Sequence, residues 1–387
     1  MTSQRLQDFG TSIFAEMSSL AIEHGAINLS QGFPDFDGPP ALIELALEAM
    51  NGGQNQYARS MGHPELVQAL ARQTREHHGL DYDPWSEIGV FCGATEAIAA
   101  SLLGILDPGD EVVLIEPFYD SYPALVSLAG ATARFVTLRF PDFALDVQAL
   151  ADCIGPRTRA IVLNTPHNPS GKVFDAQELE AIAGLCRRHD LIVIADEVYE
   201  HLCFGRARHR SIATLPGMRD RTLRISSFGK TFSMTGWKVG WAQGPAALIA
   251  AAQSAHQFLT FCAASPLQVA AARAIDRFGG DYLAQLQQDY DRRRSLLIEG
   301  LEAAGFGVAA PDGTYFVLAE FSALWEGDDR SFAEHLVREI GVAAIPPSSF
   351  YRAEPEEGRR LLRFAFCKRL ETLEAALSRL ARLPKRL

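Results

Sequence analysis

Two lysines lie close together in the stretch SSFGKTFSMTGWKVGW, residues 226–241, and the first of them follows a glycine. Gly229, Lys230 and Thr231 resemble the end of a nucleotide-binding P-loop. That motif requires another glycine five residues before Gly229, and position 224 is arginine. The sequence therefore excludes a P-loop here, and Lys230 needs another role.

Lys230 comes directly after the strand-like run TLRISS (222–227), beside the aromatic residues Phe232 and Trp237. Most lysines are solvated surface residues, but these apolar neighbours favour burial. A buried lysine near a second cation, such as Lys238, has a lowered pKa and a larger neutral fraction. Its amine can then act as a nucleophile that forms a Schiff base.

Asp196 closes a second apolar run, LIVIAD (191–196). Burying an unpaired carboxylate is costly, so Asp196 should meet a cation or a strong hydrogen-bond donor. It could cap the helix that EVYEHL would form. It could instead pair with the protonated ring nitrogen of a pyridoxal cofactor and keep that ring electron-withdrawing.

A possible phosphate site begins in FCGATEAIAASLL, which places Gly93, Ala94 and Thr95 at the start of a predicted helix. The free N–H groups and the dipole of a helix start attract anions. Ser227 and Lys238 could complete a phosphate cup. A helix start of small residues usually binds nothing, so this segment is informative only together with the others.

Four continuous apolar runs predict strands that are covered on both faces. They are EVVLIE (111–116), RAIVLN (159–164), LIVIAD (191–196) and TLRISS (222–227). Amphipathic stretches such as residues 175–190 alternate with them, which indicates an α/β fold with a mostly parallel sheet between helices. In such sheets ligands bind beyond the carboxyl ends of the strands. The polar residues at these ends are Asn164, Asn168, Asp196, Ser227 and Lys230.

The 387 residues exceed the usual size of a single core, so we expect two domains. The last hundred residues combine a charged helical stretch (285–305) with the alternating segments GTYFVLAEF and RRLLRFAFC, which indicates a smaller α+β domain. We predict a large domain over residues 41–287, a small domain over 288–387, and an N-terminal segment, 1–40, that docks on the small domain.

Composition excludes several classes of function. A net charge of −11 disfavours nucleic acid or an anionic membrane as a partner. Residues 239–272 carry no formal charge, but their glutamines and prolines favour a buried or interface helix over a membrane span. The first ten residues lack the apolar core of a signal peptide, and the six cysteines are scattered, so we expect a cytoplasmic protein. No metal-ligand spacing is present, and we expect no metal site.

Ordered sequence blocks resemble those of the class I/II aminotransferases, the fold-type-I enzymes that use pyridoxal 5′-phosphate. The blocks are NLSQGFPDFDGPP, NQYARSMGHPEL, GATEA, EPFYDSY, NTPHNPSG, ADEVYEH, SSFGKTFSMTGWKVGW, GTYF and LLRFAF. Within the family, INLSQGFPDFDGP, HQFLTF and GVAAIP are most similar to bacterial methionine aminotransferases, relatives of the kynurenine aminotransferase/glutamine transaminase K group. The resemblance implies a large domain with a seven-stranded sheet, plus a smaller domain.

The resemblance assigns the catalytic chemistry to a few residues. Lys230 is implied to form the internal aldimine and to move the proton between the substrate α-carbon and the cofactor. Asp196 is implied to pair with the pyridine nitrogen, and Tyr199 and Asn168 to hydrogen-bond the ring oxygen. Tyr119 would stack on the ring, unless it is simply a core aromatic.

The resemblance also completes the phosphate cup. It implies that Ala94, Thr95, Ser227 and Lys238 bind the phosphate together with Tyr57 of the partner subunit, so we expect a homodimer with shared sites. Many aminotransferases have arginine where Lys238 stands. Lysine gives a point charge in place of a bidentate fork, and the methionine and kynurenine group shares it.

Substrate binding is implied to centre on Arg363 in LLRFAF, whose planar fork fits an α-carboxylate. Strand alternation alone does not choose among Arg359, Arg360 and Arg363, and the resemblance selects Arg363. It implies that Asn164 and the backbone of Gly32 assist.

Phe14 and, from the neighbouring subunit, Phe261 match positions that line the side-chain pocket in the kynurenine group, although such aromatics are equally often core residues. An aromatic, uncharged pocket favours methionine and other large neutral or aromatic amino acids. The amino group would pass to a 2-oxo acid through a pyridoxamine phosphate intermediate.

Three other functions compete with this hypothesis. The same site could transaminate kynurenine with oxoglutarate, or eliminate the β-substituent of cysteine S-conjugates. A non-catalytic, pyridoxal-phosphate-binding effector domain of a transcription regulator is a third possibility. The acidic chain and the lack of a basic segment before GATEA disfavour it.

Overall fold

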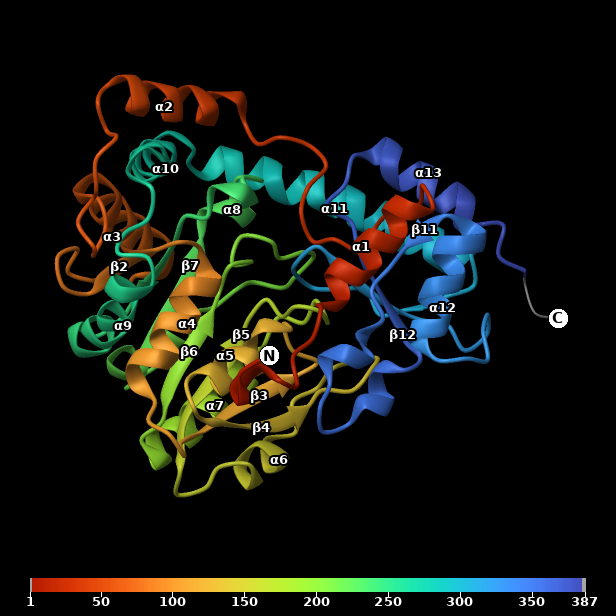
Figure 1. The fold of residues 1–387 in the computed structure, drawn as a ribbon, viewed down its shortest axis with the longest axis horizontal. Coiled ribbons are helices and arrows are strands. Elements are labelled where there is room, and N and C mark those ends of the chain that lie inside the picture. Colours follow the sequence, from red (N-terminus) through yellow and green to blue (C-terminus); the bar gives the residue numbers. More distant parts are fainter. Residues whose placement is uncertain (1, 385–387) are drawn as a thin grey trace.

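The computed structural model describes residues 2–384, and its centre is a seven-stranded sheet (Figure 1). In spatial order the strands are β2 (Ile88–Phe91), β8 (Gly240–Gln243), β7 (Thr222–Ser227), β6 (Ile192–Asp196), β5 (Thr158–Asn164), β3 (Glu111–Glu116) and β4 (Thr132–Thr137). β8 runs antiparallel to both of its neighbours, β2 and β7, and the other six strands all run in one direction. The predicted α/β fold with a mostly parallel sheet is confirmed.

Helices cover both faces of this sheet because alternate residues of each strand point to opposite sides. Val113 and Ile115 of β3 pack in a core with α7 (Ala176–His189). Val112 and Leu114 pack in the opposite core, which includes residues of α4 (Ala94–Ile105), α5 (Ser121–Leu128) and α9 (Ala246–Leu259). Strands buried on both faces explain the continuous apolar runs in the sequence.

A third core covers the β2 side of the sheet and is formed with α2 (Pro40–Asn51), α3 (Pro64–His78) and α10 (Ser265–Arg277). Local signals set the ends of α3. Pro64 occupies its first turn, and Gly79 ends it in the left-handed conformation. The short helices α6 (Val147–Asp152) and α8 (Phe228–Thr231) complete this part of the chain.

The antiparallel direction of β8 has a local effect. Ser227, the last residue of β7, pairs with Gly240, the first residue of β8. The chain therefore leaves the sheet at its carboxyl edge after Ser227 and re-enters at the same edge at Gly240, with twelve residues between them.

The C-terminal part contains the long helix α11 (Gly280–Ala303) and a three-stranded antiparallel sheet. Its strands are β12 (Leu361–Ala365), β10 (Phe316–Glu320) and β9 (Gly307–Val308), and its other helices are α12 (Asp329–His335) and α13 (Leu370–Leu380).

The N-terminal segment lies among these C-terminal elements. Figure 1 shows α1 (Ile13–Glu23), in red, beside the blue end of the chain. Ile13 and Met17 share a hydrophobic core with Leu297 of α11. β1 (Ile27–Asn28) pairs in parallel with β11 (Val342–Ala343).

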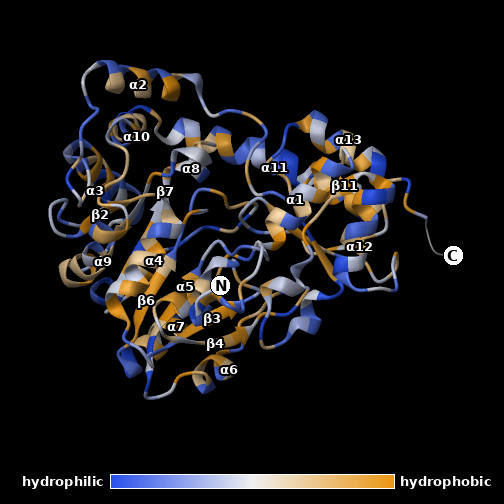
Figure 2. Cartoon of the chain, in the orientation of Figure 1, coloured by the Kyte–Doolittle hydropathy of each residue, from blue (hydrophilic) through white to orange (hydrophobic). Residues whose placement is uncertain are grey.

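The uncharged segment 239–272 does not form the single helix that the sequence suggested. Gly244 and Pro245 end β8 before α9, and an irregular stretch separates α9 from α10. Among the described residues no helix is long and apolar enough to cross a membrane. Figure 2 shows the apolar residues gathered on the central sheet, with mixed colouring on the surrounding helices.

The close packing of α4 on α9 predicts an unusual glycine effect. A Cβ added at Gly104 of α4 would lie 2.2 Å from the carbonyl oxygen of Ala251 and 2.5 Å from its carbonyl carbon. Alanine gains about 1 kcal/mol over glycine in a helix, but overpacking costs about 1–3 kcal/mol, and a clash with backbone atoms this close belongs in the upper part of that range, about 2–3 kcal/mol. We expect Gly104→Ala to lower the free energy of unfolding by about 1–2 kcal/mol, measured by urea titration.

Gly184 of α7 is the matched control. An added Cβ there has only arginine side-chain tips at 4.0 Å, so Gly184→Ala should raise the free energy of unfolding by about 0.5–1 kcal/mol. If Gly104→Ala were as stable as the parent, the close α4–α9 contact would be wrong.

Candidate active site

A cavity of about 350 Å³ lies at the carboxyl edge of the central sheet, within the size range of small-molecule sites. It brings together nearly all of the predicted site residues. Those that line it are Phe14, Gly32, Gly93, Ala94, Thr95, Tyr119, Asn164, Asn168, Asp196, Tyr199, Ser227, Lys230, Lys238 and Arg363.

Lys230 enters the cavity from α8, the single turn that follows β7. Its Nζ donates a hydrogen bond to the hydroxyl of Tyr315 at 2.9 Å, and that hydroxyl donates to the carbonyl oxygen of Gly32 at 2.6 Å. The amine is thus held in place by a tyrosine from the C-terminal part and a carbonyl from the N-terminal segment.

Burial lowers the pKa of Lys230 from 10.5 to about 8. Cys367 and Asp196 oppose this shift, and Lys238 adds to it. The sequence analysis expects both burial and a second cation to lower the pKa, and removal from water is the larger of these two causes. A substantial fraction of the amine is therefore neutral, and nucleophilic, at slightly alkaline pH.

Asp196 ends β6 and is buried. The hydroxyl of Tyr122 donates to its Oδ2 at 2.5 Å, and the backbone N–H of Val198 donates to its Oδ1 at 3.3 Å. Burial raises the pKa of Asp196, while these two donors and Lys230 lower it. Since a buried carboxylate favours a cationic partner, Asp196 suits a protonated ring nitrogen.

Tyr199 stands between the lysine and the C-terminal part. Its ring makes an edge contact with Tyr315 at 5.1 Å, and the Nζ of Lys230 lies 5.6 Å from its centroid. Burial raises the pKa of Tyr199, so its hydroxyl remains a hydrogen-bond donor at neutral pH.

Arg363 is a fully buried arginine on β12. It donates from Nη2 to the carbonyl oxygen of Ser30 at 2.9 Å and from Nη1 to Oδ1 of Asn168 at 3.1 Å. Its guanidinium lies 4.0 Å from the ring centroid of Phe316 and 4.9 Å from that of Phe14. Burial lowers the pKa of Arg363 to about 10, which still leaves the group charged at neutral pH.

Asn164 and Asn168 connect these groups. Asn164 donates from Nδ2 to the backbone oxygen of Asp196 at 2.9 Å and accepts from the backbone N–H of Asn168 at 2.7 Å. Asn168 in turn accepts from Arg363. Hydrogen bonds therefore run without a break from the end of β6 to the buried arginine.

The predicted anion site is formed at the start of α4. Gly93 precedes this helix with a positive φ of 85° and no side chain caps its first turn. A Cβ at Gly240 would lie 2.5 Å from the backbone nitrogen of Ala94, so only glycine lets β8 approach this closely. Ser227 and Lys238 line the same cavity, which places a hydroxyl and an ammonium group with the helix start.

Tyr119 lies at the wall of the cavity, where its ring makes an edge contact with Tyr122 at 5.6 Å. Tyr57 and Phe261 do not line the cavity of this chain. They lie together on the surface, with ring centroids 5.2 Å apart and 84% and 46% of their areas exposed. Both had been expected to serve a partner's site.

The sequence prediction missed two tyrosines that contact the central groups, Tyr122 at Asp196 and Tyr315 at Lys230. Both lie in blocks that carried the resemblance, EPFYDSY and GTYF, yet no role was attached to them. The available signal for Tyr122 was its position three residues after Tyr119.

The cavity fits a flat cofactor that carries an aldehyde, a basic ring nitrogen and a phosphate. Lys230 offers a partly neutral amine, Asp196 a buried carboxylate, and the uncapped start of α4 a set of free N–H groups. Arg363 lines the same cavity, and its Nε has no hydrogen-bond partner among the described residues, so the guanidinium can bind a carboxylate while Asn168 and Ser30 hold it.

Comparison with known proteins agrees with this chemistry. The family model for aminotransferase class I and II matches residues 24–380. The probable N-succinyldiaminopimelate aminotransferase DapC of Mycobacterium tuberculosis is 48% identical, over 100% of this chain and 99% of that protein. The methionine aminotransferase of Escherichia coli is 42% identical, over 98% of this chain and 97% of that protein.

Solved structures match equally well. The N-succinyldiaminopimelate aminotransferase structure from M. tuberculosis has a TM-score of 0.96 at 48% identity, and covers 99% of this chain and 100% of that one. An E. coli structure with methionine aminotransferase function has a TM-score of 0.94 at 40% identity, and covers 99% and 100%.

Burial of Lys230 predicts a stability cost in the cofactor-free protein. Between pH 8 and 10.5 the unfolded chain binds a proton that the folded chain does not, so stability rises with pH across that window. At pH 7 the penalty is about 3 kcal/mol, at about 1.4 kcal/mol per pH unit. Lys230→Met removes it and loses a hydrogen bond worth about 1 kcal/mol.

We therefore expect cofactor-free Lys230→Met to be about 2 kcal/mol more stable than the parent at pH 7, with the difference shrinking as the pH rises through 8 to 10.5. Urea unfolding of both proteins at several pH values measures it. A difference that did not change with pH would contradict the lowered pKa.

Proposed function

The chain belongs to the class I and II aminotransferases, and from that premise we propose that it moves the amino group of methionine, and of other large neutral or aromatic amino acids, to a 2-oxo acid. Its cofactor is pyridoxal 5′-phosphate. We propose that it works in the cytoplasm.

Lys230, Asp196 and Tyr199 are proposed to act on the cofactor ring. Pyridoxal 5′-phosphate, when bound, withdraws electrons from the substrate bond that breaks. Lys230 would hold the cofactor covalently and, once the substrate amine has displaced it, would move the proton at the substrate α-carbon, which its pKa of about 8 supports. Asp196 holds the proton of the ring nitrogen, and Tyr199 donates to the ring oxygen together with Asn168.

The other cofactor contacts in the proposal hold the phosphate and the ring face. Ala94 and Thr95 offer backbone N–H groups, following Gly93 at the helix start, and Ser227 and Lys238 offer a hydroxyl and a charge. Tyr119 lies against the ring. The uncapped start of α4 and the cavity lining support these roles.

Arg363 is proposed to bind the α-carboxylate of the substrate, with Asn164 and the backbone of Gly32 beside it. The guanidinium is already fixed by Ser30 and Asn168 and is flanked by aromatic rings. Because its orientation is set before the substrate arrives, little entropy is lost when the carboxylate binds.

The observation that carries the substrate class is the charge of the cavity lining. Its basic residues are Lys230, Lys238 and Arg363, and the proposal gives each of them a partner: the aldehyde, the phosphate and the α-carboxylate. No further lysine or arginine lines the cavity among residues 2–384, while Phe14 and Phe33 do. An uncharged side chain is therefore favoured over a second carboxylate.

A second candidate substrate is a succinylated diamino dicarboxylic acid. The 48% identity to the M. tuberculosis protein over the whole chain favours it. Such a substrate carries further carboxylates, which need cations that this cavity does not supply from its own chain. A partner subunit would have to provide them.

A screen of amino donors tests the proposal. We expect L-methionine, L-phenylalanine and L-glutamine to bleach the visible absorbance of the cofactor-loaded enzyme in stopped-flow experiments, and to do so faster than L-aspartate. Faster reaction with N-succinyl-LL-diaminopimelate than with methionine would overturn the methionine proposal in favour of the second candidate.

Two controls accompany the screen. Arg363→Gln should raise KM for every amino acid by about a hundredfold or more, because a buried charged hydrogen-bond partner of the carboxylate is lost. A cysteine S-conjugate should release little pyruvate. Pyruvate release faster than methionine transamination would favour β-elimination on the same site.

We also propose that the enzyme is a homodimer with shared sites. Exposed apolar residues support this, since Tyr57 and Phe258 expose 84% and 86% of their areas, and α2 exposes Ile43 and Leu47. Figure 2 shows apolar colouring on α2 at the surface of the molecule. The exposed rings of Tyr57 and Phe261 contact each other, and a contiguous exposed apolar patch commonly marks an interface between subunits.

Phe258→Arg should convert the dimer into monomers at micromolar concentration, because an arginine would be buried without a partner. Sedimentation velocity measures it. Cofactor affinity should fall as well if Tyr57 of the partner subunit binds the phosphate. Val147→Arg, at an exposed site on α6, is the control and should remain dimeric. A monomeric parent with full activity would refute the shared site.

A further inference from the structure

A second group of charged side chains is buried outside the cavity. Arg224 of β7 lies at its centre, with only 2% of its side chain exposed. Glu197 and Glu200, which follow β6, are 0% and 5% exposed. His78 at the end of α3 and His209 complete the group.

Arg224 contacts both carboxylates. Its Nε lies 2.6 Å from Oε2 of Glu197, and its Nη2 pairs with Oε2 of Glu200. Its Nη1 donates to Oε1 of Gln243 on β8 at 2.7 Å. His209 adds a contact of 3.2 Å between its Nε2 and the same oxygen of Glu197.

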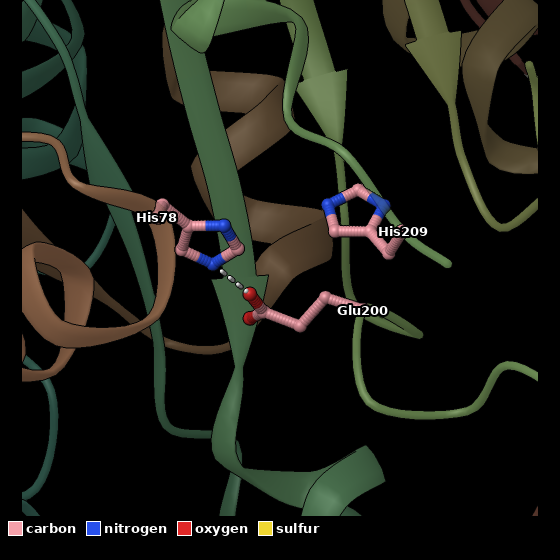
Figure 3. Close-up of side chains that lie close together, drawn as sticks. All are labelled: His78, Glu200 and His209. Atoms are coloured by element: carbon pink, nitrogen blue, oxygen red, sulfur yellow. Dashed lines mark hydrogen bonds and ion pairs between the residues drawn. The ribbon is translucent and has the colours of Figure 1, made fainter. Parts of the chain in front are cut away.

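Figure 3 shows His78, Glu200 and His209, whose ligand atoms lie close enough together to hold a metal ion. Nε2 of His78 is 2.8 Å from Oε2 of Glu200, but Arg224 Nη2 lies 2.9 Å from that nitrogen and pairs with that oxygen. A guanidinium already occupies the position, and it would repel a metal cation. The group is therefore better explained as an ion-pair network.

The network keeps its carboxylates ionised. Burial by itself raises the pKa of Glu200, but Arg224 and the neighbouring imidazoles lower it well below its usual value. Burial by itself also raises the pKa of Glu197, but His209 and Arg224 together lower that pKa below its usual value. Charges this deeply buried are tolerated only when their partners are fixed in position.

Each carboxylate of the network is next in sequence to a residue of the cavity. Glu197 follows Asp196, and Glu200 follows Tyr199. The segment between them is a turn and not a strand. Its backbone hydrogen bonds run from Glu197 N–H to the carbonyl of Ile225, at 2.8 Å, from Glu200 N–H to the carbonyl of Glu197, at 2.9 Å, and from Leu202 N–H to the carbonyl of Tyr199, at 2.8 Å.

Glu200 also contacts β7, the strand that ends at the cavity residue Ser227. Ser226 donates from Oγ to Oε1 of Glu200 at 2.7 Å, and the next residue is Ser227, which lines the cavity. Arg224 lies on the same strand, β7. The turn after β6 and the end of β7 are therefore held together by side chains that do not reach the cavity.

We propose that Arg224, Glu197 and Glu200 form a buried ionic clamp that positions Asp196, Tyr199 and Ser227 for the cofactor. They are positioning residues, since none of them lines the cavity. The clamp rests on the proposed function in one respect, that these three cavity residues contact pyridoxal 5′-phosphate.

The clamp should set the electronic environment of the bound cofactor. Asp196 and Tyr199 are proposed to contact opposite polar groups of its ring, so a small shift of the turn would change both contacts. The pH midpoint of the visible absorbance of the bound cofactor reports this change, whereas a loss of stability alone would leave that midpoint unaltered.

The test uses two variants, because Arg224→Gln alone would strand two buried carboxylates and could unfold the chain. The triple variant Glu197→Gln, Arg224→Gln, Glu200→Gln keeps a hydrogen-bonding amide at each position and removes the charges of all three side chains. The single variant Glu200→Gln leaves Arg224 paired with Glu197. Circular dichroism and urea unfolding check that each is folded.

For the folded triple variant we expect cofactor affinity, titrated into the cofactor-free protein, to fall by about tenfold to a hundredfold, as is usual when outer partners of a binding site are lost. The pH midpoint of the visible absorbance should move by about half a unit or more. The single variant Glu200→Gln should change the cofactor affinity and the pH midpoint in the same directions as the triple variant does, but by smaller amounts.

The control is the double variant Arg221→Gln, Asp190→Asn, which removes an ion pair of 2.8 Å with Asp190 88% exposed. It should leave affinity and midpoint at the parent values. If the parent binds the cofactor and both clamp variants match it in cofactor affinity and in pH midpoint, the clamp is refuted while the proposed function still stands. A parent that binds no pyridoxal 5′-phosphate would overturn the proposed function, and the clamp with it.

Discussion

The buried guanidinium of Arg363 is the interaction on which the assembly of the site depends. Removing a cation from water costs several kcal/mol unless partners replace the water. Its partners are Ser30 of the N-terminal segment, Asn168 from the loop after β5, and the ring of Phe316 on β10. Because they come from three distant parts of the chain, the cost is offset only when all three are in place. An oriented, buried cation is then present in the cavity before any ligand binds.

Much of the fold could be predicted from local pattern. The continuous apolar runs identified β3, β5, β6 and β7, and parallel strands end at one edge, so Asn164 and Lys230 could be placed together from spacing alone. β2 and β8 were not identified, since each has four residues. β4 alternates between exposed and half-buried residues over its first four positions, unlike the buried runs. The uncharged stretch 239–272 looked like one helix because charge says little about chain breaks at Gly244 and Pro245.

What local pattern missed depends on contacts between distant residues. Tyr122 and Asp196 are 74 positions apart, and Tyr315 and Lys230 are 85 apart. Arg224 stood inside a run that was read as apolar, and its carboxylate partners became visible only when β6 and β7 were side by side. Charged residues that position a site without lining it are the hardest to predict, because neither their type nor their spacing differs from that of charged surface residues.

The reversal of the chain at β8 has a consequence for how this protein can vary. β7 ends and β8 begins at the same edge of the sheet, so one short connecting segment, residues 228–239, contains both Lys230 and Lys238. The strand residues at its two ends, Ser227 and Gly240, are paired. Side chains along it can be exchanged one at a time, but an insertion or deletion would displace both lysines at once. In evolution this connecting segment should change its amino-acid composition far more readily than its length.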